Sequence, residues 1–187
     1  MEKSLEAPLR KALIFLEESG FPYAIIGGIA LAQWGVVRAT LDVDIKVLVP
    51  DNDYTKMRTA LRTKFPNTTR KELETHPLIV SVDIDGVSID FFLVLPGYEE
   101  NIITRAVRRD LTGWQAWICS AEDLIIQKVV AGRGKDWLDI EALLIEQHRR
   151  LDQDYIDTWL SEFAEALDDP DLIAKYRHLD QQVEKLF

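Results

Sequence analysis

The sequence predicts an α+β fold, with a small mixed β-sheet flanked by helices and followed by a helical C-terminal lobe. Short runs rich in Val, Ile and Leu dominate the first part of the chain, and Asp85-Gly86 joins two of them as a hairpin turn. After Ser120 the apolar residues recur at helical spacing instead. Strands first and helices afterwards are typical of an α+β arrangement. We therefore expect an α/β core over residues 1–110 and a mainly helical lobe, packed on it, over residues 111–187.

In the first half of the chain, apolar spacing and chain breakers define the expected elements. The first helix has Leu and Ala at helical spacing and ends at Gly20 and Pro22. The run from Pro50 to Asp53 ends a buried strand and caps the next helix. The helices expected here cover residues 3–18, 29–34, 54–64 and 99–109. The strands expected here cover residues 23–26, 41–49, 78–84 and 87–95.

In the second half, capping residues mark the helices. Ser120 is an expected N-cap, with Asp123 as a weaker substitute for Glu at the third position of a capping box. Gly132-Arg133-Gly134 breaks the helix that Ser120 opens. The helices expected in this half cover residues 120–131, 137–146, 155–167 and 172–186.

Composition restricts the class of protein. The chain has 187 residues and a net charge of −10, which argues against a broadly basic surface for nucleic acid. The single cysteine, Cys119, rules out an internal disulfide and is compatible with a reducing compartment. The N-terminus is unlike a signal peptide, and no apolar run approaches the roughly 20 residues that a membrane span needs. We expect a cytoplasmic protein without a membrane partner.

Asp42 and Asp44 lie in the strand expected at residues 41–49. Because side chains alternate along a strand, both carboxylates point to the same face, which Lys46 shares. Like charges on a buried strand are costly to desolvate unless something compensates them. A divalent cation is the simplest compensation, since Mg²⁺ usually binds one or two carboxylates together with substrate phosphates. The alternative is a strand end that reaches solvent, where the two acids only cap a turn.

Asp90 lies inside the apolar strand expected at residues 87–95, where an unpaired carboxylate is again costly. If that strand neighbours the one with Asp42 and Asp44, the three carboxylates can hold two divalent ions and activate a hydroxyl. The alternative is an exposed hairpin face, in which case Asp83 is the substitute third acid. Gly27-Gly28 lies between a strand and a helix, where backbone N–H groups can approach a phosphate, although a tight turn needs the same residues.

This pattern resembles the DNA polymerase β-like nucleotidyltransferase superfamily, which has a Gly-Gly or Gly-Ser turn, a helix, Asp-x-Asp on a strand and a third acid on a later strand. The string GGIALAQWGVVRATLDVDI is similar to the minimal nucleotidyltransferases grouped with the AbiEii abortive-infection toxins. A second block, SAEDLIIQKVVAGRGKDWLDIEALL, also resembles that group, and the two blocks span about the middle two-thirds of the chain. The matching positions are Gly27, Gly28, Gly35, Arg38, Thr40, Asp42, Asp44, Asp90, Lys128, Arg133, Lys135, Asp136 and Asp139.

The resemblance implies a nucleotidyltransferase-like fold and transfer of a nucleoside monophosphate from an NTP to an acceptor hydroxyl, with Mg²⁺ or Mn²⁺. It implies that Asp42, Asp44 and Asp90 are both the metal ligands and the catalytic residues. The residues implied for nucleotide binding are Gly27, Gly28, Arg38, Thr40, Lys128 and Lys135. For Lys128 the alternative is an aliphatic stem buried on a helix with its amine at the surface, and the Gly132–Lys135 segment is alternatively a plain helix C-cap.

The expected partners are an NTP and an acceptor, which is an RNA end, a protein hydroxyl or a cationic small molecule. The net charge of −10 suits a cationic acceptor, whereas a local basic patch of Arg105, Arg108, Arg109 and Lys135 would serve RNA. The AbiEii resemblance also indicates the toxin of a toxin–antitoxin pair, with an antitoxin as partner. The alternative function is a catalytically silent binding or regulatory module, but the presence of all three acids favours the enzyme.

Overall fold

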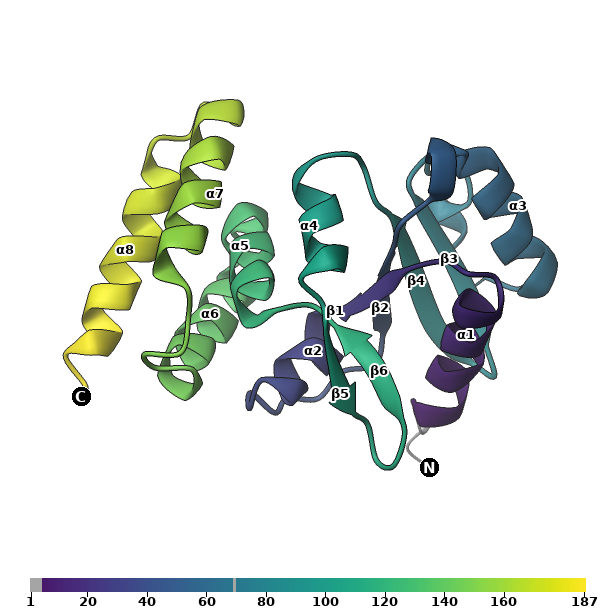
Figure 1. The fold of residues 1–187 in the computed structure, drawn as a ribbon, viewed down its shortest axis with the longest axis horizontal. Helices are drawn as coiled ribbons and strands as arrows, with labels where there is room; N and C mark the ends of the chain where they lie inside the picture. Colours follow the sequence, from purple (N-terminus) through teal and green to yellow (C-terminus); the bar gives the residue numbers. More distant parts are fainter. Residues whose placement is uncertain (1–4, 69) are drawn as a thin grey trace. The chain divides into compact units, whose positions relative to one another are not determined.

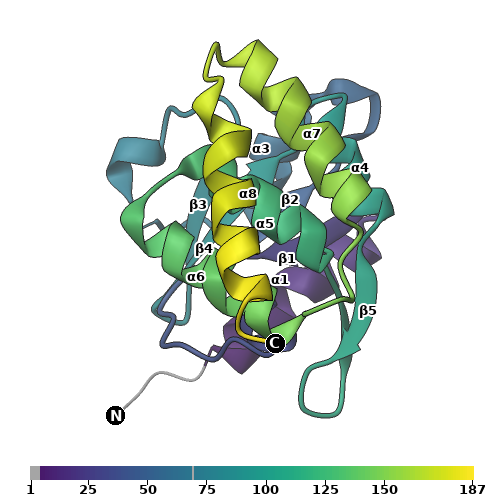
Figure 2. The same cartoon turned by 90° about the vertical axis from the view of Figure 1, so that its left-hand side faces the viewer.

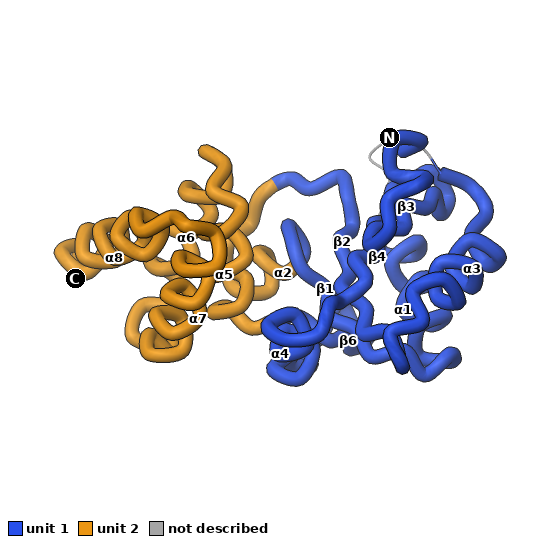
Figure 3. Tube along the Cα trace, turned by 90° about the horizontal axis from the view of Figure 1, so that it is seen from above, with its two compact units in different colours: residues 1–29, 39–119 blue, residues 30–38, 120–187 orange. Residues whose placement is uncertain are grey.

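The computed structural model describes residues 5–68 and 70–187. The chain divides into two compact units, one formed by residues 1–29 and 39–119 and the other by residues 30–38 and 120–187 (Figure 3). The boundary expected between residues 110 and 111 falls inside a β-hairpin. Because the strands of a hairpin are hydrogen-bonded to each other, the first unit extends to Cys119.

The first unit contains a six-stranded sheet with the strand order β3-β4-β2-β1-β6-β5 (Figure 1). Strand β2 pairs with β4, and β1 with β6, in parallel, whereas the other neighbours are antiparallel. The expected mixed sheet and α+β class are therefore confirmed. The strands are β1 (Tyr23–Ile26), β2 (Val43–Val47), β3 (Ile79–Ile84), β4 (Val87–Leu93), β5 (Val107–Asp110) and β6 (Gln115–Ile118).

Helices cover both faces of this sheet. Figures 1 and 3 show α1 and α3 on one face and α4 on the other. Val43, Ile45 and Val47 of β2 are fully buried on the face opposite to Asp44 and supply the centre of the core. The Asp53 carboxylate caps α3 by accepting a hydrogen bond of 2.9 Å from the Lys56 N–H. The helices of this unit are α1 (Glu6–Glu18), α3 (Tyr54–Lys64) and α4 (Tyr98–Thr104), with 3-10 turns η1 (Pro50–Asn52) and η2 (Lys71–Leu73). Helix α2 (Gly27–Gln33) begins in the first unit and belongs to the second from Ala30 onwards.

The helix expected over residues 99–109 is wrong in its second half. Helix α4 ends at Thr104, and residues 107–110 form β5, which pairs with β6. In β6 the buried Ala116 and Ile118 alternate with exposed Gln115 and Trp117, which is the period of a strand. Smaller differences are early helix starts, because α2 begins at Gly27 and α6 at Gly134, and a shorter strand, because β2 covers Val43–Val47 instead of residues 41–49 and leaves Asp42 just before it.

The second unit is helical, as expected. Figure 2 shows α8 (Asp171–Glu184) between α6 (Gly134–Glu146) and α7 (Gln153–Ala166). The predicted cap at Ser120 is confirmed, since its hydroxyl oxygen accepts a hydrogen bond of 3.0 Å from the Asp123 N–H at the start of α5 (Ala121–Ala131). The predicted break after α5 is confirmed by the left-handed conformation of Gly132, with φ 62°. No helix within residues 5–68 and 70–187 has the length and apolar character needed to cross a membrane.

Candidate active site

Strands β2 and β4 bring the three predicted acids to one face of the sheet. Asp44 is paired with Asp90 in the parallel register, and paired residues of neighbouring strands point to the same face. Asp42 lies two residues before Asp44, just ahead of β2, and one arginine, Arg70, contacts both Asp42 and Asp90. The side-chain exposure falls from 47% at Asp42 to 3% at Asp90, so the set runs from the surface into the sheet. We call Asp42, Asp44 and Asp90 the acid face.

An arginine that the sequence interpretation missed joins two of these acids. Arg70 Nη1 donates to Asp90 Oδ2 at 2.6 Å, and Arg70 Nη2 donates to Asp42 Oδ2 at 2.8 Å. The residue lies in an irregular segment just before η2, with no periodic pattern to indicate its contacts. Compensation of the buried charges was expected, but from a metal ion. In this arrangement a guanidinium supplies it.

The acid face nevertheless fits a divalent cation in its chemistry. Asp90 Oδ1 is buried and has no hydrogen-bond partner among the described residues, so one acceptor remains unsatisfied. Carboxylate oxygens are the ligands that Mg²⁺ prefers in proteins. No three His, Cys, Asp or Glu side chains in the described parts of the chain are grouped so as to hold a metal ion. Arg70 lies between Asp42 and Asp90 in this arrangement.

Gly27 and Gly28 are required by side chains of the same region. A Cβ at Gly27 would lie 2.3 Å from Asp44 Oδ2, and a Cβ at Gly28 would lie 2.7 Å from Thr40 Oγ1. Gly27 also has a φ of +66°, which strains residues that carry a Cβ. Thr40 in turn donates from its hydroxyl to the Asp42 carbonyl at 3.1 Å. The Gly-Gly turn therefore lets Asp44 of β2 and Thr40 in the segment before it pack against the end of β1.

The predicted residues Arg38 and Lys128 lie in the second unit, in a network of ion pairs. The buried Lys128 donates to Asp139 Oδ2 at 2.6 Å and to Asp136 Oδ1 at 3.5 Å. Arg133 Nε binds Asp136 Oδ2 at 2.6 Å, and Arg38 Nε lies 3.2 Å from Asp139 Oδ1. Lys128 is thus a buried, paired cation, and the alternative of an amine carried to the surface is wrong.

Asp136 and Lys135 differ sharply in their surroundings. Burial alone would raise the pKa of Asp136, but the hydrogen bonds and charges of Arg133 and Lys128 outweigh it and hold this pKa below its ordinary value. Asp136 is therefore a structural anion at neutral pH. Lys135, at the start of α6, is exposed.

Two other expectations concern residues near the acid face. Asp83, the substitute third acid, accepts a hydrogen bond of 2.9 Å from the Gly86 N–H and so supports the β3–β4 turn. Lys46 shares the face of Asp44, as expected, and its amine pairs with Glu99 of α4. Both side chains are engaged in holding the fold of the first unit.

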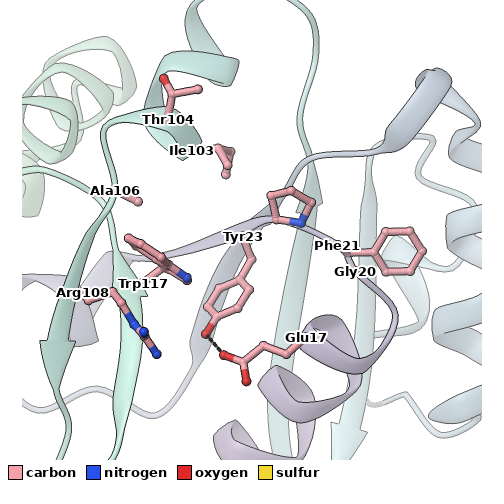
Figure 4. Close-up of a pocket in the computed structure, with 10 residues that line it drawn as sticks. Glu17, Gly20, Phe21, Tyr23, Ile103, Thr104, Ala106, Arg108 and Trp117 are labelled. Atoms are coloured by element: carbon pink, nitrogen blue, oxygen red, sulfur yellow. Dashed lines mark hydrogen bonds between the residues drawn. The ribbon is translucent and has the colours of Figure 1, made fainter.

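A separate cavity of about 550 Å³ lies at the end of β1 away from the acid face (Figure 4). Tyr23 donates to Glu17 Oε1 at 2.9 Å, and the Arg108 guanidinium lies 5.5 Å from the centroid of the Trp117 ring. Burial, then the hydrogen bond and charge of Glu17, raise the pKa of Tyr23. Arg108 of the expected basic patch therefore faces an aromatic side chain of this cavity.

Solved structures and a family model resemble the chain. ANT(2'')-Ia in a crystal structure with adenylyl-2''-tobramycin is 15% identical, with a TM-score of 0.53 over 85% of this chain and 96% of that chain. A solution structure of the antibiotic-resistance factor ANT(2'')-Ia, also 15% identical, has a TM-score of 0.55 over 92% of this chain and 96% of that chain. An antigenic nucleotidyltransferase-like protein from Paracoccidioides brasiliensis is 18% identical, with a TM-score of 0.46 over 92% and 93% of the two chains.

The structural likeness to ANT(2'')-Ia shows a shared nucleotidyltransferase-like fold. No curated protein matches the sequence significantly. A family model described as "Nucleotidyltransferase of unknown function (DUF6036)" matches residues 11–185, which is nearly the whole chain. Members of the wider class generally transfer a nucleoside monophosphate from an NTP with a divalent metal. The protein belongs to this nucleotidyltransferase family.

Proposed function

We propose that the acid face is the catalytic centre of a metal-dependent transfer of a nucleoside monophosphate from an NTP to an acceptor hydroxyl. The observation that supports this most is the register that sets Asp44 beside Asp90 in parallel strands, with Asp42 two residues earlier. These three carboxylates would hold Mg²⁺ or Mn²⁺. The bound metal would neutralise the triphosphate and lower the pKa of the acceptor hydroxyl.

Within this proposal the residues have different tasks. Asp90 takes the innermost position, and its unpartnered Oδ1 supports a role as metal ligand or as the base for the acceptor proton. Gly27 and Gly28 keep Asp44 and Thr40 in place, and their own contact with phosphate stays a prediction. Such a transfer depends mainly on positioning and charge neutralisation, which a set of carboxylates and cations supplies.

The two lysines predicted for the nucleotide are not equivalent. Lys128 has its charge balanced by Asp136 and Asp139, so we assign it to the stability of the second unit. Arg38 is likewise paired with Asp139. Lys135 is exposed, and it remains the better candidate for a phosphate contact.

For the acceptor we favour a cationic small molecule. The net charge of −10 attracts cations and opposes a long RNA. In the ANT(2'')-Ia crystal structure the adenylyl group is carried by tobramycin, which supports an acceptor of that chemical kind for this chain. An RNA end and a protein hydroxyl are the other acceptors to test.

The direct test incubates the protein with each α-labelled NTP, Mg²⁺ or Mn²⁺, and one acceptor of each class. We expect label transfer by the wild type and its loss in Asp42→Asn and Asp44→Asn. Asp83→Asn is the matched control, because it changes an aspartate whose carboxylate accepts a hydrogen bond from the Gly86 N–H of the β3–β4 turn. Transfer that survives both acid-face substitutions would remove the metal assignment. NTP binding without transfer to any acceptor would favour the silent binding or regulatory module.

The toxin role is a separate proposal that rests on the AbiEii resemblance. If the protein is the toxin of a toxin–antitoxin pair, its induced expression arrests growth and the Asp42→Asn variant does not. A neighbouring gene that restores growth would be the antitoxin. Normal growth at high expression of the active protein would argue against this role and leave the transferase proposal intact.

A further inference from the structure

We propose that Arg70 competes with the divalent cation for Asp42 and Asp90, and so sets the metal affinity of the acid face. The inference rests on the proposed function, since it assumes that a cation binds these acids. It adds a residue that lies outside the Asp-x-Asp strand and the later acid-bearing strand.

The geometry gives Arg70 the place of a bridging cation. Two different guanidinium nitrogens reach two different carboxylates, at 2.6 Å from Asp90 Oδ2 and 2.8 Å from Asp42 Oδ2. Planar, charge-assisted contacts of this kind are the strong ones among hydrogen bonds. A metal that used the same two oxygens would need them at about 2.0–2.1 Å, which leaves no room for the guanidinium between them.

The unsatisfied oxygen supports an exchange of partners. Asp90 is nearly fully buried and Arg70 contacts only its Oδ2, while Oδ1 has no partner among the described residues. A monovalent guanidinium therefore compensates this carboxylate incompletely. A divalent ion carries twice the charge of a guanidinium and is coordinated by several oxygens. It should therefore stabilise the buried Asp90 carboxylate more strongly than Arg70 does.

Arg70 can leave without unfolding the segment that carries it. Before it, the Asn67 carbonyl accepts from the Asp83 N–H at 2.7 Å, and after it the Glu74 carbonyl accepts from Arg58 Nη2 at 3.2 Å. The segment is thus tied to β3 on one side and to α3 on the other. The Arg70 side chain is one-third exposed, with 34% of its surface accessible, so rotation of the side chain alone can carry the guanidinium into water.

The test measures binding of Mn²⁺ alone, without nucleotide, by the electron paramagnetic resonance signal of free Mn²⁺. We expect Arg70→Gln to bind Mn²⁺ about tenfold more tightly than the wild type, which corresponds to about 1.4 kcal/mol. Arg70→Lys should shift the affinity less, because a lysine keeps the charge but cannot bridge two carboxylates with a planar fork. Arg177→Gln is the matched control. It removes an arginine paired with Asp157 in the second unit and should leave the affinity unchanged.

Thermal unfolding is the second measurement, and it also shows whether each variant is folded. Without metal, Arg70→Gln should unfold at a lower temperature than the wild type, because Asp42 and Asp90 lose their counter-ion. Added Mn²⁺ should raise its unfolding temperature by more than that of the wild type. Arg70→Lys serves for the affinity comparison if Arg70→Gln does not fold.

The outcomes separate this inference from the proposed function. The competition would be overturned if the Arg70 variants bound Mn²⁺ as tightly as the wild type, or more weakly. Either result would remain compatible with metal-dependent transfer. No Mn²⁺ binding by the wild type together with clear binding by Arg70→Gln would support the competition strongly. No binding by any of these proteins would overturn both the inference and the metal dependence.

Discussion

Replacing Gly27 by alanine should destabilise the first unit by two separable effects. The residue has a φ of +66°, and a left-handed conformation costs a residue with a Cβ about 1–2 kcal/mol. The new Cβ would also lie 2.3 Å from Asp44 Oδ2, and forced repacking of this kind costs about 1–3 kcal/mol. We therefore expect Gly27→Ala to lower the free energy of unfolding by about 2–5 kcal/mol in total.

Gly20 provides the matched control for this prediction. Its φ of +71° is nearly that of Gly27, but a Cβ there would have no heavy atom within 4 Å. Gly20→Ala should cost only the backbone strain, so urea unfolding should separate the two variants by about 1–3 kcal/mol. Any gain from a stiffer unfolded chain is common to both substitutions and cancels. Equal losses in the two variants would refute the argument that Asp44 packs against Gly27.

Three further predictions concern other contacts. Lys128→Met should lower the free energy of unfolding in urea by about 3–5 kcal/mol, because it leaves Asp136 and Asp139 buried without their shared cation. A decrease of less than about 1 kcal/mol would contradict the buried pairing. Burial, with Glu184 and Asp157 nearby, raises the pKa of Asp180 against the opposing effect of His148, so ionised Asp180 destabilises the fold at neutral pH. Asp180→Asn should then raise the unfolding temperature at pH 7, and this gain should vanish as the pH falls through the folded pKa towards the unfolded value of about 3.9; a gain that persists in acid would refute it. Tyr23→Phe removes the hydrogen bond to Glu17 and should lower the free energy of unfolding by about 1 kcal/mol. Glu17→Gln keeps an acceptor for that bond and should lower the free energy of unfolding by less in the same urea assay.

The acids could be placed from the sequence because their pattern is local. Asp42 and Asp44 are two residues apart at the start of an apolar run, so the alternation expected of a strand puts them on one face, although β2 itself begins at Val43. Asp90 was identified by the cost of a carboxylate in the run VSIDFFLV. The sequence alone does not show that the two acid-bearing strands are neighbours. The structure shows it, because β2 and β4 pair in parallel.

The contacts that were missed depend on tertiary structure. Arg70 reaches Asp42 across 28 residues and Asp90 across 20, and no periodicity connects them. Strand β5 has the sequence VRRD, which by itself indicates no apolar face. Its pairing with β6 overrides the weak helical tendency. Gly113, with φ +94°, lies in the turn between the two strands, and glycine is a residue typical of turns.

The pairing of β1 with β6 also has a consequence for how the chain is made. Ile25 pairs with Ile118, and the Cys119 N–H donates to the Ile25 carbonyl at 3.0 Å. During synthesis, one edge of β1 therefore waits for a partner that leaves the ribosome only after the hairpin of β3 and β4 and its neighbour β2 have emerged. A sheet closed by such a distant contact forms late and slowly. Nascent chains that stop before Gln115 should consequently expose the β1 edge and be the species most in need of a chaperone.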